Sequence, residues 1–266
     1  MFLRFHAHRL GNEISNFALL RHRRCDGMTV SMHQSGTHWL KHQLGVAIAL
    51  QYGLPPPQFM DANDIIGGFK DSPPPSHVPH IISSHSIPHV LVGSRLLRYF
   101  LHFPRYVVLI RDIRSCLVSN YEKWKDTYGC SFSEFLHVGI GERRFNSDFW
   151  WCLRFFNAWG RIAQRFPSRT LVVRYEDMNS EPHLVIARIS DFLNLDLNEE
   201  QINIATRMST KTHMKTKESG ADGLAVIRED TRPPSDWFTE KDRILFSERC
   251  TKLLRHDFGY DYNLWH

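Results

Sequence analysis

A turn of small and polar residues joins an apolar run to a helical pattern near the start of the chain. Its residues are Gln34, Ser35, Gly36, Thr37, His38 and Trp39. The first amides of a helix have no partner within the helix and attract anions, and Gly36 allows a phosphate to approach the backbone. Ser35 and Thr37 add hydroxyl donors, although Ser and Thr also favour an ordinary helix start. The turn therefore indicates a phosphate site or a plain helix cap, and it lacks the GxxxxGK[ST] pattern of P-loop nucleoside triphosphatases.

The elements that must position this turn alternate along the chain. We predict strands at residues 28–32, 80–84, 106–110 and 170–173, and helices at 37–52, 113–125, 149–166, 182–193, 201–208 and 240–255. The run at 106–110 is apolar throughout and rich in β-branched residues, which is typical of a central parallel strand buried on both faces. This alternation predicts one α/β domain with a central, mainly parallel sheet flanked by helices. The phosphate turn would follow the first strand, at the carboxyl edge where such sheets bind ligands.

Two segments interrupt the alternation. Proline triplets bracket residues 55–79, and we predict a mostly irregular loop there because proline sustains neither a helix nor a central strand. Residues 211–236 show little hydrophobic periodicity, and we predict a long surface loop. We assign residues 1–27 to a peripheral, partly helical N-terminal extension and residues 28–266 to the domain.

The composition narrows the class of protein. Of the 266 residues, 42% are hydrophobic and 23% are charged, as in ordinary globular proteins, and the net charge of +5 favours an anionic ligand. The chain has no run of like charges that would indicate nucleic-acid binding, and no apolar stretch of about 18 residues that would indicate a transmembrane helix. Its five scattered cysteines include no CxxC pair, so we expect no metal site. Free thiols in a reducing compartment fit best, and we expect a cytoplasmic protein.

Three segments taken together resemble the sulfotransferases that use 3′-phosphoadenosine 5′-phosphosulfate (PAPS). The turn at residues 32–39 is similar to the family's Lys-Ser-Gly-Thr-Thr-Trp motif. The segment at 107–119 resembles the second motif, a strand ending in Arg with a Ser eight residues later. A third similar segment lies at 171–178. Their order and separation match the family over about residues 28–262, which implies a cytosolic-type sulfotransferase domain.

The resemblance implies a role for each matching residue. Arg111 and Ser119 would hold the 3′-phosphate of PAPS, since a planar guanidinium matches phosphate oxygens in pairs; a structural ion pair is the alternative for Arg111. Tyr175 would pack near the adenine, or would be a plain core tyrosine. Further cofactor contacts are implied at Ser209, Thr210 and either Arg228 or Arg232, although a solvated charged loop explains the two arginines equally well.

His85 is our candidate for the general base. It follows the second predicted strand, in a segment that resembles the family's Lys-Thr-His-Leu-Pro. A neutral imidazole is well suited to accept a proton near pH 7. His33, His38 and His89 lie near the same edge and remain rivals. The acceptor would be a hydroxyl or amine, and the spent cofactor would be adenosine 3′,5′-bisphosphate (PAP).

Two lysines of the family pattern are missing. Gln34 replaces the loop lysine that helps neutralise the leaving oxygen, and Ser83 replaces the lysine two residues before the histidine. Neutral donors are worth roughly half as much as charged ones. The leaving group would therefore depend on Gln34, on helix amides and on a cation from elsewhere. Lys70 in the proline-bracketed loop is one candidate, and we expect Lys41 to be too far along its helix.

Three functions stay open on the sequence. The first is a sulfotransferase for a hydroxylated small molecule, glycan or lipid, with residues 55–79, 142–148 and the aromatic run 149–151 lining an apolar acceptor pocket unless the aromatics pack in the core. The second is a catalytically weak or inactive protein that binds PAPS or PAP, because of Gln34. The third is a nucleotide kinase, which the absence of a lysine after Gly36 disfavours. A homodimer is compatible with the sequence.

Overall fold

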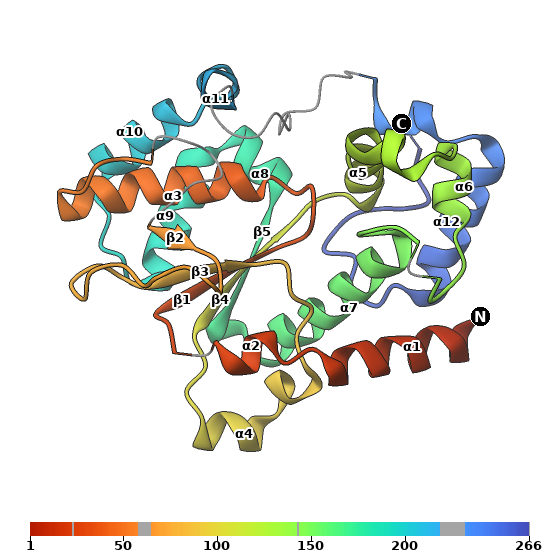
Figure 1. Ribbon diagram of the computed structural model, residues 1–266, viewed down its shortest axis with the longest axis horizontal. Helices are drawn as coiled ribbons and strands as arrows, with labels where there is room; N and C mark the ends of the chain where they lie inside the picture. The colour runs from red at the N-terminus through yellow and green to blue at the C-terminus, as the bar shows by residue number, and fades with distance from the viewer. Residues whose placement is uncertain (23, 58–64, 143, 219–231, 266) are drawn as a thin grey trace.

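Five strands form a single parallel sheet in the order β2-β3-β1-β4-β5 (Figure 1). This computed structural model describes residues 1–22, 24–57, 65–142, 144–218 and 232–265. The strands are β1 (Gly27–Ser31), β2 (Ile66–Gly67), β3 (Ile81–Ser84), β4 (Arg105–Ile110) and β5 (Thr170–Arg174). Because every pair is parallel, the strands all end at one edge, and the predicted α/β fold with a mainly parallel sheet is confirmed.

Helices cover both faces of this sheet. They are α1 (Phe2–Ser15), α2 (Ala18–Arg21), α3 (Thr37–Tyr52), α4 (Arg95–Phe100), α5 (Ile113–Tyr128), α6 (Phe132–His137), α7 (Phe149–Arg165), α8 (Tyr175–Ser180), α9 (Pro182–Leu193), α10 (Glu199–Met208), α11 (Lys211–Glu218) and α12 (Glu240–Leu253), with short 3₁₀ turns η1 (Val90–Gly93), η2 (Pro167–Arg169) and η3 (Pro234–Trp237). Figure 1 shows α3, α9 and α10 on one side of the sheet and α1, α2 and α7 on the other. Among the described residues, no helix combines the length and the apolar character needed to cross a membrane.

The interior strand β4 separates two hydrophobic clusters. Tyr106, Val108 and Ile110 belong to the larger cluster, which includes the buried side chains of α7 and α12. Val107 and Leu109 belong to the second cluster, with side chains of α3 and α9. Successive side chains of a strand point to opposite faces, so an entirely apolar strand must be covered on both. The apolar run therefore fixes β4 in the middle of the fold.

The first helices pack against this body. Phe5 of α1 and Leu19 of α2 are fully buried in the larger cluster, and the Phe5 ring lies 6.2 Å from that of Trp150 on α7. Glu13 is also buried, and its carboxylate accepts a 2.8 Å hydrogen bond from Arg161 of α7. A buried carboxylate needs such a partner. The N-terminal segment thus contains the predicted helical structure and is tied to α7.

The element predictions held, with one clear correction. Residues 37–52 and 182–193 form helices with the predicted bounds, and the other predicted strands and helices are present with ends that differ by a few residues. The prediction of a loop from residue 211 is wrong for residues 211–218, which form α11. One buried side chain, Met214 at 2% exposure, attaches this helix to the protein, and Thr210 caps it by accepting from the His213 amide at 3.4 Å. One buried residue leaves no repeating hydrophobic pattern in the sequence of α11. Residues 219–231 lie outside the described part, and residues 55–79 include the short β2.

Candidate active site

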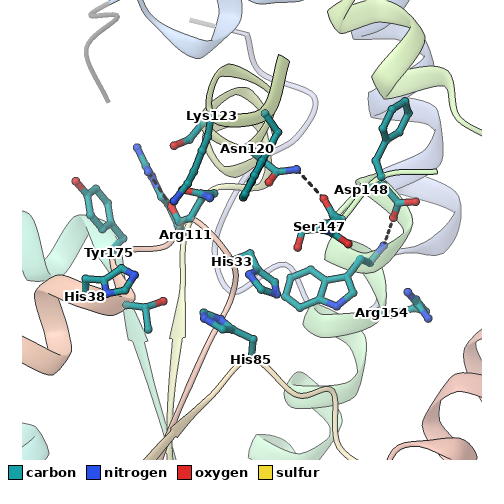
Figure 2. Close-up of a pocket in the computed structure, with 18 of the residues that line it drawn as sticks. His33, His38, His85, Arg111, Asn120, Lys123, Ser147, Asp148, Arg154 and Tyr175 are labelled. Atoms are coloured by element: carbon teal, nitrogen blue, oxygen red, sulfur yellow. Dashed lines mark hydrogen bonds between the residues drawn. The ribbon is translucent and has the colours of Figure 1, made fainter. Parts of the chain in front are cut away.

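A cavity of about 880 Å³ lies where the loops after the parallel strands meet (Figure 2). Most of the residues predicted from the sequence to form the site line it, namely Gln34, Gly36, Thr37, His38, Trp39, His85, Arg111, Ser119 and Tyr175. They come from the turns after β1, β3 and β4, from the starts of α3 and α8, and from α5. The topology of the sheet therefore brings together side chains that lie up to 141 positions apart, as in Gln34 and Tyr175 (175 minus 34).

The turn after β1 has a backbone that few residues adopt. Gly36, the residue before α3, has φ +92°, and Gln34 has φ +62°. A Cβ atom on Gly36 would lie 2.8 Å from Cδ2 of Tyr175, so both the conformation and the space require glycine. Ser35 is fully buried, and its hydroxyl donates to the Met32 carbonyl at 2.5 Å. Ser35 thus braces the turn from inside, and its side chain does not line the cavity.

Arg111 is held in place by two neighbours. Its Nη1 donates to the Gln34 carbonyl at 2.9 Å, and its Cζ lies 4.3 Å from the centre of the Tyr175 ring. The edge of Trp39 packs on the same tyrosine, with ring centres 5.8 Å apart. Arg111 takes no part in the ion pairs found among the described residues. Its positive charge is therefore oriented into the cavity without a carboxylate to neutralise it, as an anion site requires.

His85 has the hydrogen bond that a general base needs. Its Nδ1 lies 2.8 Å from the Ser31 carbonyl. Because a carbonyl only accepts, Nδ1 carries the proton and Nε2 is left with a lone pair. Burial lowers the pKa of His85, the Ser31 bond opposes this effect, and the charge of Lys41 adds to it. The ring is accordingly neutral at pH 7.

The rival histidines have different surroundings. The His33 ring stacks on His85 with centres 4.0 Å apart, and burial, His85 and the charge of Lys123 lower the pKa of His33 to about 3. His38 also lines the cavity. His89 does not: it is buried, and its Nδ1 accepts from the Leu91 amide at 3.1 Å to cap η1.

The remaining predicted contacts that the structure describes, Ser209, Thr210 and Arg232, do not line the cavity. The Ser209 carbonyl accepts from Trp39 Nε1 at 2.7 Å, so Ser209 orients a residue that does line the cavity. Thr210 is exposed at the start of α11. Arg232 is exposed, with its guanidinium 4.3 Å from the Trp237 ring centre. Arg228 lies outside the described residues.

Several lining residues were not expected from the sequence. They are His8 and Asn12 of α1, Asn120 and Lys123 of α5, and Arg154 of α7, whereas Phe145, Asn146, Ser147 and Asp148 belong to the segment 142–148 that we predicted to line the pocket. Lys123 is four residues after Ser119, and positions four apart share one face of a helix, so this spacing could have revealed it. Nothing local in the sequence indicates that α1 reaches the cavity.

The end of the cavity near α7 is more polar than the apolar pocket that we expected. Phe149 and Trp150 pack in the core, and only Trp151 of this aromatic run lines the cavity. Asp148 caps α7 by accepting from the Trp151 amide at 2.8 Å. Burial raises the pKa of Asp148, while that hydrogen bond and the charge of Arg154 favour its carboxylate. The described residues of 55–79 do not line the cavity.

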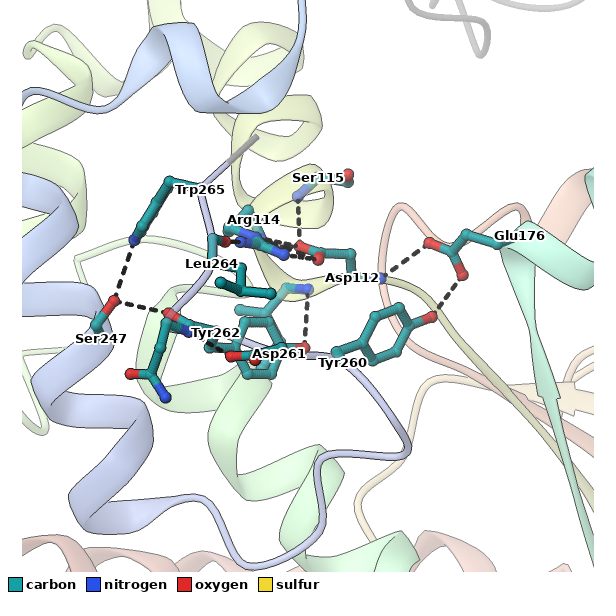
Figure 3. A network of polar contacts seen from close by, with 12 residues as sticks. Asp112, Arg114, Ser115, Glu176, Ser247, Tyr260, Asp261, Tyr262, Leu264 and Trp265 are labelled. Carbon is teal, nitrogen blue, oxygen red and sulfur yellow. Dashed lines mark hydrogen bonds and ion pairs between the residues drawn. The ribbon is translucent and has the colours of Figure 1, made fainter.

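A polar network behind Arg111 fixes the start of α5 to the C-terminal segment (Figure 3). Asp112 caps α5 and binds Arg114 Nη2 at 2.6 Å. Its amide donates to Glu176 at 3.3 Å, and the Tyr260 hydroxyl donates to the same carboxylate at 2.5 Å. Tyr262 accepts from the Ile113 amide at 3.4 Å. Arg111 and Tyr175 adjoin Asp112 and Glu176 in the chain, so the network also holds the cavity residues.

Comparison with known proteins identifies a family of similar sequences. The family model described as "Sulfotransferase domain" matches residues 25–226. Mouse sulfotransferase 2A6 is 29% identical over 160 residues, which cover 57% of this chain and 51% of that protein. Mouse sulfotransferase 2A2 is 29% identical over 165 residues with the same coverage. The chain thus spans about half the length of the curated relatives it matches.

Solved structures share the fold along nearly the whole chain. The crystal structure of mouse sulfotransferase SULT7A1 complexed with PAP has a TM-score of 0.64 at 16% identity, and the match covers 95% of this chain and 92% of that chain. Retinol dehydratase in a complex with retinol and PAP has a TM-score of 0.58 at 18% identity, covering 95% and 88%.

Proposed function

We propose, because this chain belongs to the sulfotransferase domain family, that it transfers a sulfuryl group from PAPS to a hydroxyl or amine of an acceptor, with His85 as the general base. One observation carries the proposal. The turn after β1, the charge of Arg111 and the lone pair of His85 Nε2 belong to a single cavity. A phosphate site, an anion clamp and a base are the parts that such a transfer requires.

The residues present fit a nucleotide that carries two anionic ends. PAPS, when bound, supplies an activated sulfuryl group on its 5′-phosphate. The N-terminus of α3, with the amides of Gly36 and Thr37, suits that end. Arg111 and Ser119 would hold the 3′-phosphate, and Tyr175 and Trp39 offer ring surfaces for the adenine. Glycine at position 36 supports this assignment, since any Cβ there would meet the Tyr175 ring.

His85 would act on the acceptor. The Ser31 carbonyl holds Nδ1–H, so Nε2 is available to take the acceptor proton as the new bond to sulfur forms. His33 packs flat against the His85 ring and keeps it from rotating. His85 therefore needs no prior deprotonation at pH 7, because burial lowers its pKa.

The acceptor would enter between α1, α5 and the start of α7. That end combines ring surfaces, Trp124, Phe145 and Trp151, with polar groups such as Asn12 and Asp148. Such a lining suits a hydroxyl-bearing small molecule, glycan or lipid headgroup. We also propose a cytoplasmic location, which is supported by five free cysteines, four of them buried.

The test is binding of PAP by calorimetry together with transfer of labelled sulfate from PAPS to phenols, sterols, glycans and lipids. We expect binding of PAP and transfer to at least one acceptor class, with His85→Ala binding PAP normally and transferring nothing. Binding without transfer to any acceptor would favour a binding protein, the alternative that Gln34 and Ser83 suggest. Failure to bind PAP would contradict both functions.

A further inference from the structure

The cavity lacks the two lysines that the family pattern would place beside the leaving oxygen. Gln34 and Ser83 stand at those positions and carry no charge. The cation candidates from the sequence do not fill the gap, since Lys70 is exposed and neither Lys70 nor Lys41 lines the cavity. A growing negative charge in a water-poor site nevertheless needs a positive neighbour.

Three lysine or arginine side chains line the cavity among the described residues: Arg111, Lys123 and Arg154. Arg111 is oriented by the Gln34 carbonyl and the Tyr175 ring. Arg154 lies at the other end, where its Nε donates to the Trp150 carbonyl at 3.3 Å. Figure 2 shows Lys123 extending from α5 toward the turn, beside Arg111 and above His33.

Lys123 is close to the reacting end by two observations. It is four residues after Ser119 on α5, so both side chains lie on the face of α5 that lines the cavity. Its charge also acts on His33, whose ring stacks at 4.0 Å on the proposed base. The ammonium group therefore faces the region between the β1 turn and His85.

We propose that Lys123 supplies the cation that the β1 turn lacks and binds the 5′-phosphosulfate end of PAPS, an inference that rests on the proposed function. During transfer the acceptor oxygen bonds to sulfur, and the bond from sulfur to the 5′-phosphate oxygen breaks. The electron pair stays on that phosphate oxygen, and the acceptor proton passes to Nε2 of His85. The charge of Lys123 stabilises this electron pair, so the lysine acts from α5 in place of a lysine in the turn.

Binding without turnover tests the placement directly. Two nucleotides separate the ends: PAP carries both phosphates, whereas adenosine 3′-monophosphate lacks the 5′-phosphate. We expect Lys123→Ala and Lys123→Met to weaken the binding of PAP by roughly 10-fold or more, which is the effect of losing a charged hydrogen bond. The affinity for adenosine 3′-monophosphate should change by less than about twofold. Lys125→Ala removes an exposed lysine of the same helix and should change neither. Equal losses for both nucleotides, or no loss, would overturn the proposal.

Rescue by the missing lysine tests the catalytic part. Lys123→Met should lower kcat by roughly 10–100-fold with a smaller change in KM for the acceptor. Adding Gln34→Lys to this variant should restore most of kcat, because a charge would return on the opposite side of the same oxygen. If the unaltered protein fails to bind PAP, the proposed function falls as well. If it binds and transfers but Lys123→Met is equally fast, only the role of Lys123 is refuted.

Discussion

Replacing Gly36 by alanine tests the nucleotide site with a single methyl group. The added Cβ would lie 2.8 Å from Cδ2 of Tyr175, closer than such atoms approach in proteins, and 3.0 Å from Cε2 of the same ring. The ring must move, and with it the surface on which the Arg111 guanidinium rests at 4.3 Å. The substitution should therefore disturb the cavity as well as the fold.

The expected cost has two parts. A non-glycine residue at φ +92° costs about 1–2 kcal/mol of strain. Displacing Tyr175 from Arg111 forfeits a cation–π contact of about 0.5–1 kcal/mol. Gly36→Ala should then destabilise the protein by about 1.5–3 kcal/mol, which lowers Tm by roughly 3–12 °C for a chain of this size.

Gly53→Ala is the matched control. Gly53 ends α3 with φ +64°, and a Cβ there would have nothing within 4 Å. Urea unfolding of Gly53→Ala should show a loss of about 1–2 kcal/mol in the free energy of unfolding, and its affinity for PAP should be unchanged. Gly36→Ala should bind PAP at least about tenfold more weakly. Equal stability and equal binding of the two variants would refute the collision with Tyr175.

Three further outcomes follow from the site. Arg111→Ala should weaken PAP by roughly 10–100-fold in calorimetry while adenosine 5′-monophosphate binds almost as before, because only PAP has the 3′-phosphate; a uniform loss would contradict that role. Burial lowers the pKa of His33 to about 3 in the folded protein, while its pKa is near 6.5 in the unfolded chain. The unfolded state therefore binds one more proton than the folded state between these pH values. Stability should fall as the pH is lowered from 6.5 to 3, by at most about 1.4 kcal/mol per pH unit. In urea unfolding at pH 5 and 7, His33→Gln should reduce this dependence, and an unchanged slope would count against it. Tyr260→Phe removes the hydrogen bond to Glu176 and should cost about 1–2 kcal/mol by denaturation, with no effect if the bond is absent in solution.

Local signals predicted the elements that carry the proposed nucleotide half of the site. The apolar run of β4 and the small-residue turn before α3 are strong patterns, and the parallel topology then implies that Arg111, His85 and Gln34 meet at one edge. Ser35 shows the limit of such reasoning. Its residue type suggested a ligand hydroxyl, while the conformation of the turn directs that hydroxyl to the Met32 carbonyl.

The acceptor half depends on contacts that no local pattern encodes. His8 and Asn12 line the cavity because Phe5 and Glu13 of the same helix anchor it against α7. Met214 is the one buried side chain among those described on α11, and a single buried position leaves no periodic signal. Long-range packing decided these positions, and spacing along the chain could not predict them.

The part of the cavity lined by α1 affects whether acceptor specificity can be transferred from relatives to this chain. The family match begins at residue 25, so His8 and Asn12 stand outside the region that this chain shares with the family model. Two members of the family could share the residues that bind the sulfuryl donor and still differ in the residues that line the acceptor end of the cavity. For this chain, acceptor choice is therefore a property to be measured on the protein itself, since the region shared with the family model does not include α1, two residues of which line the cavity.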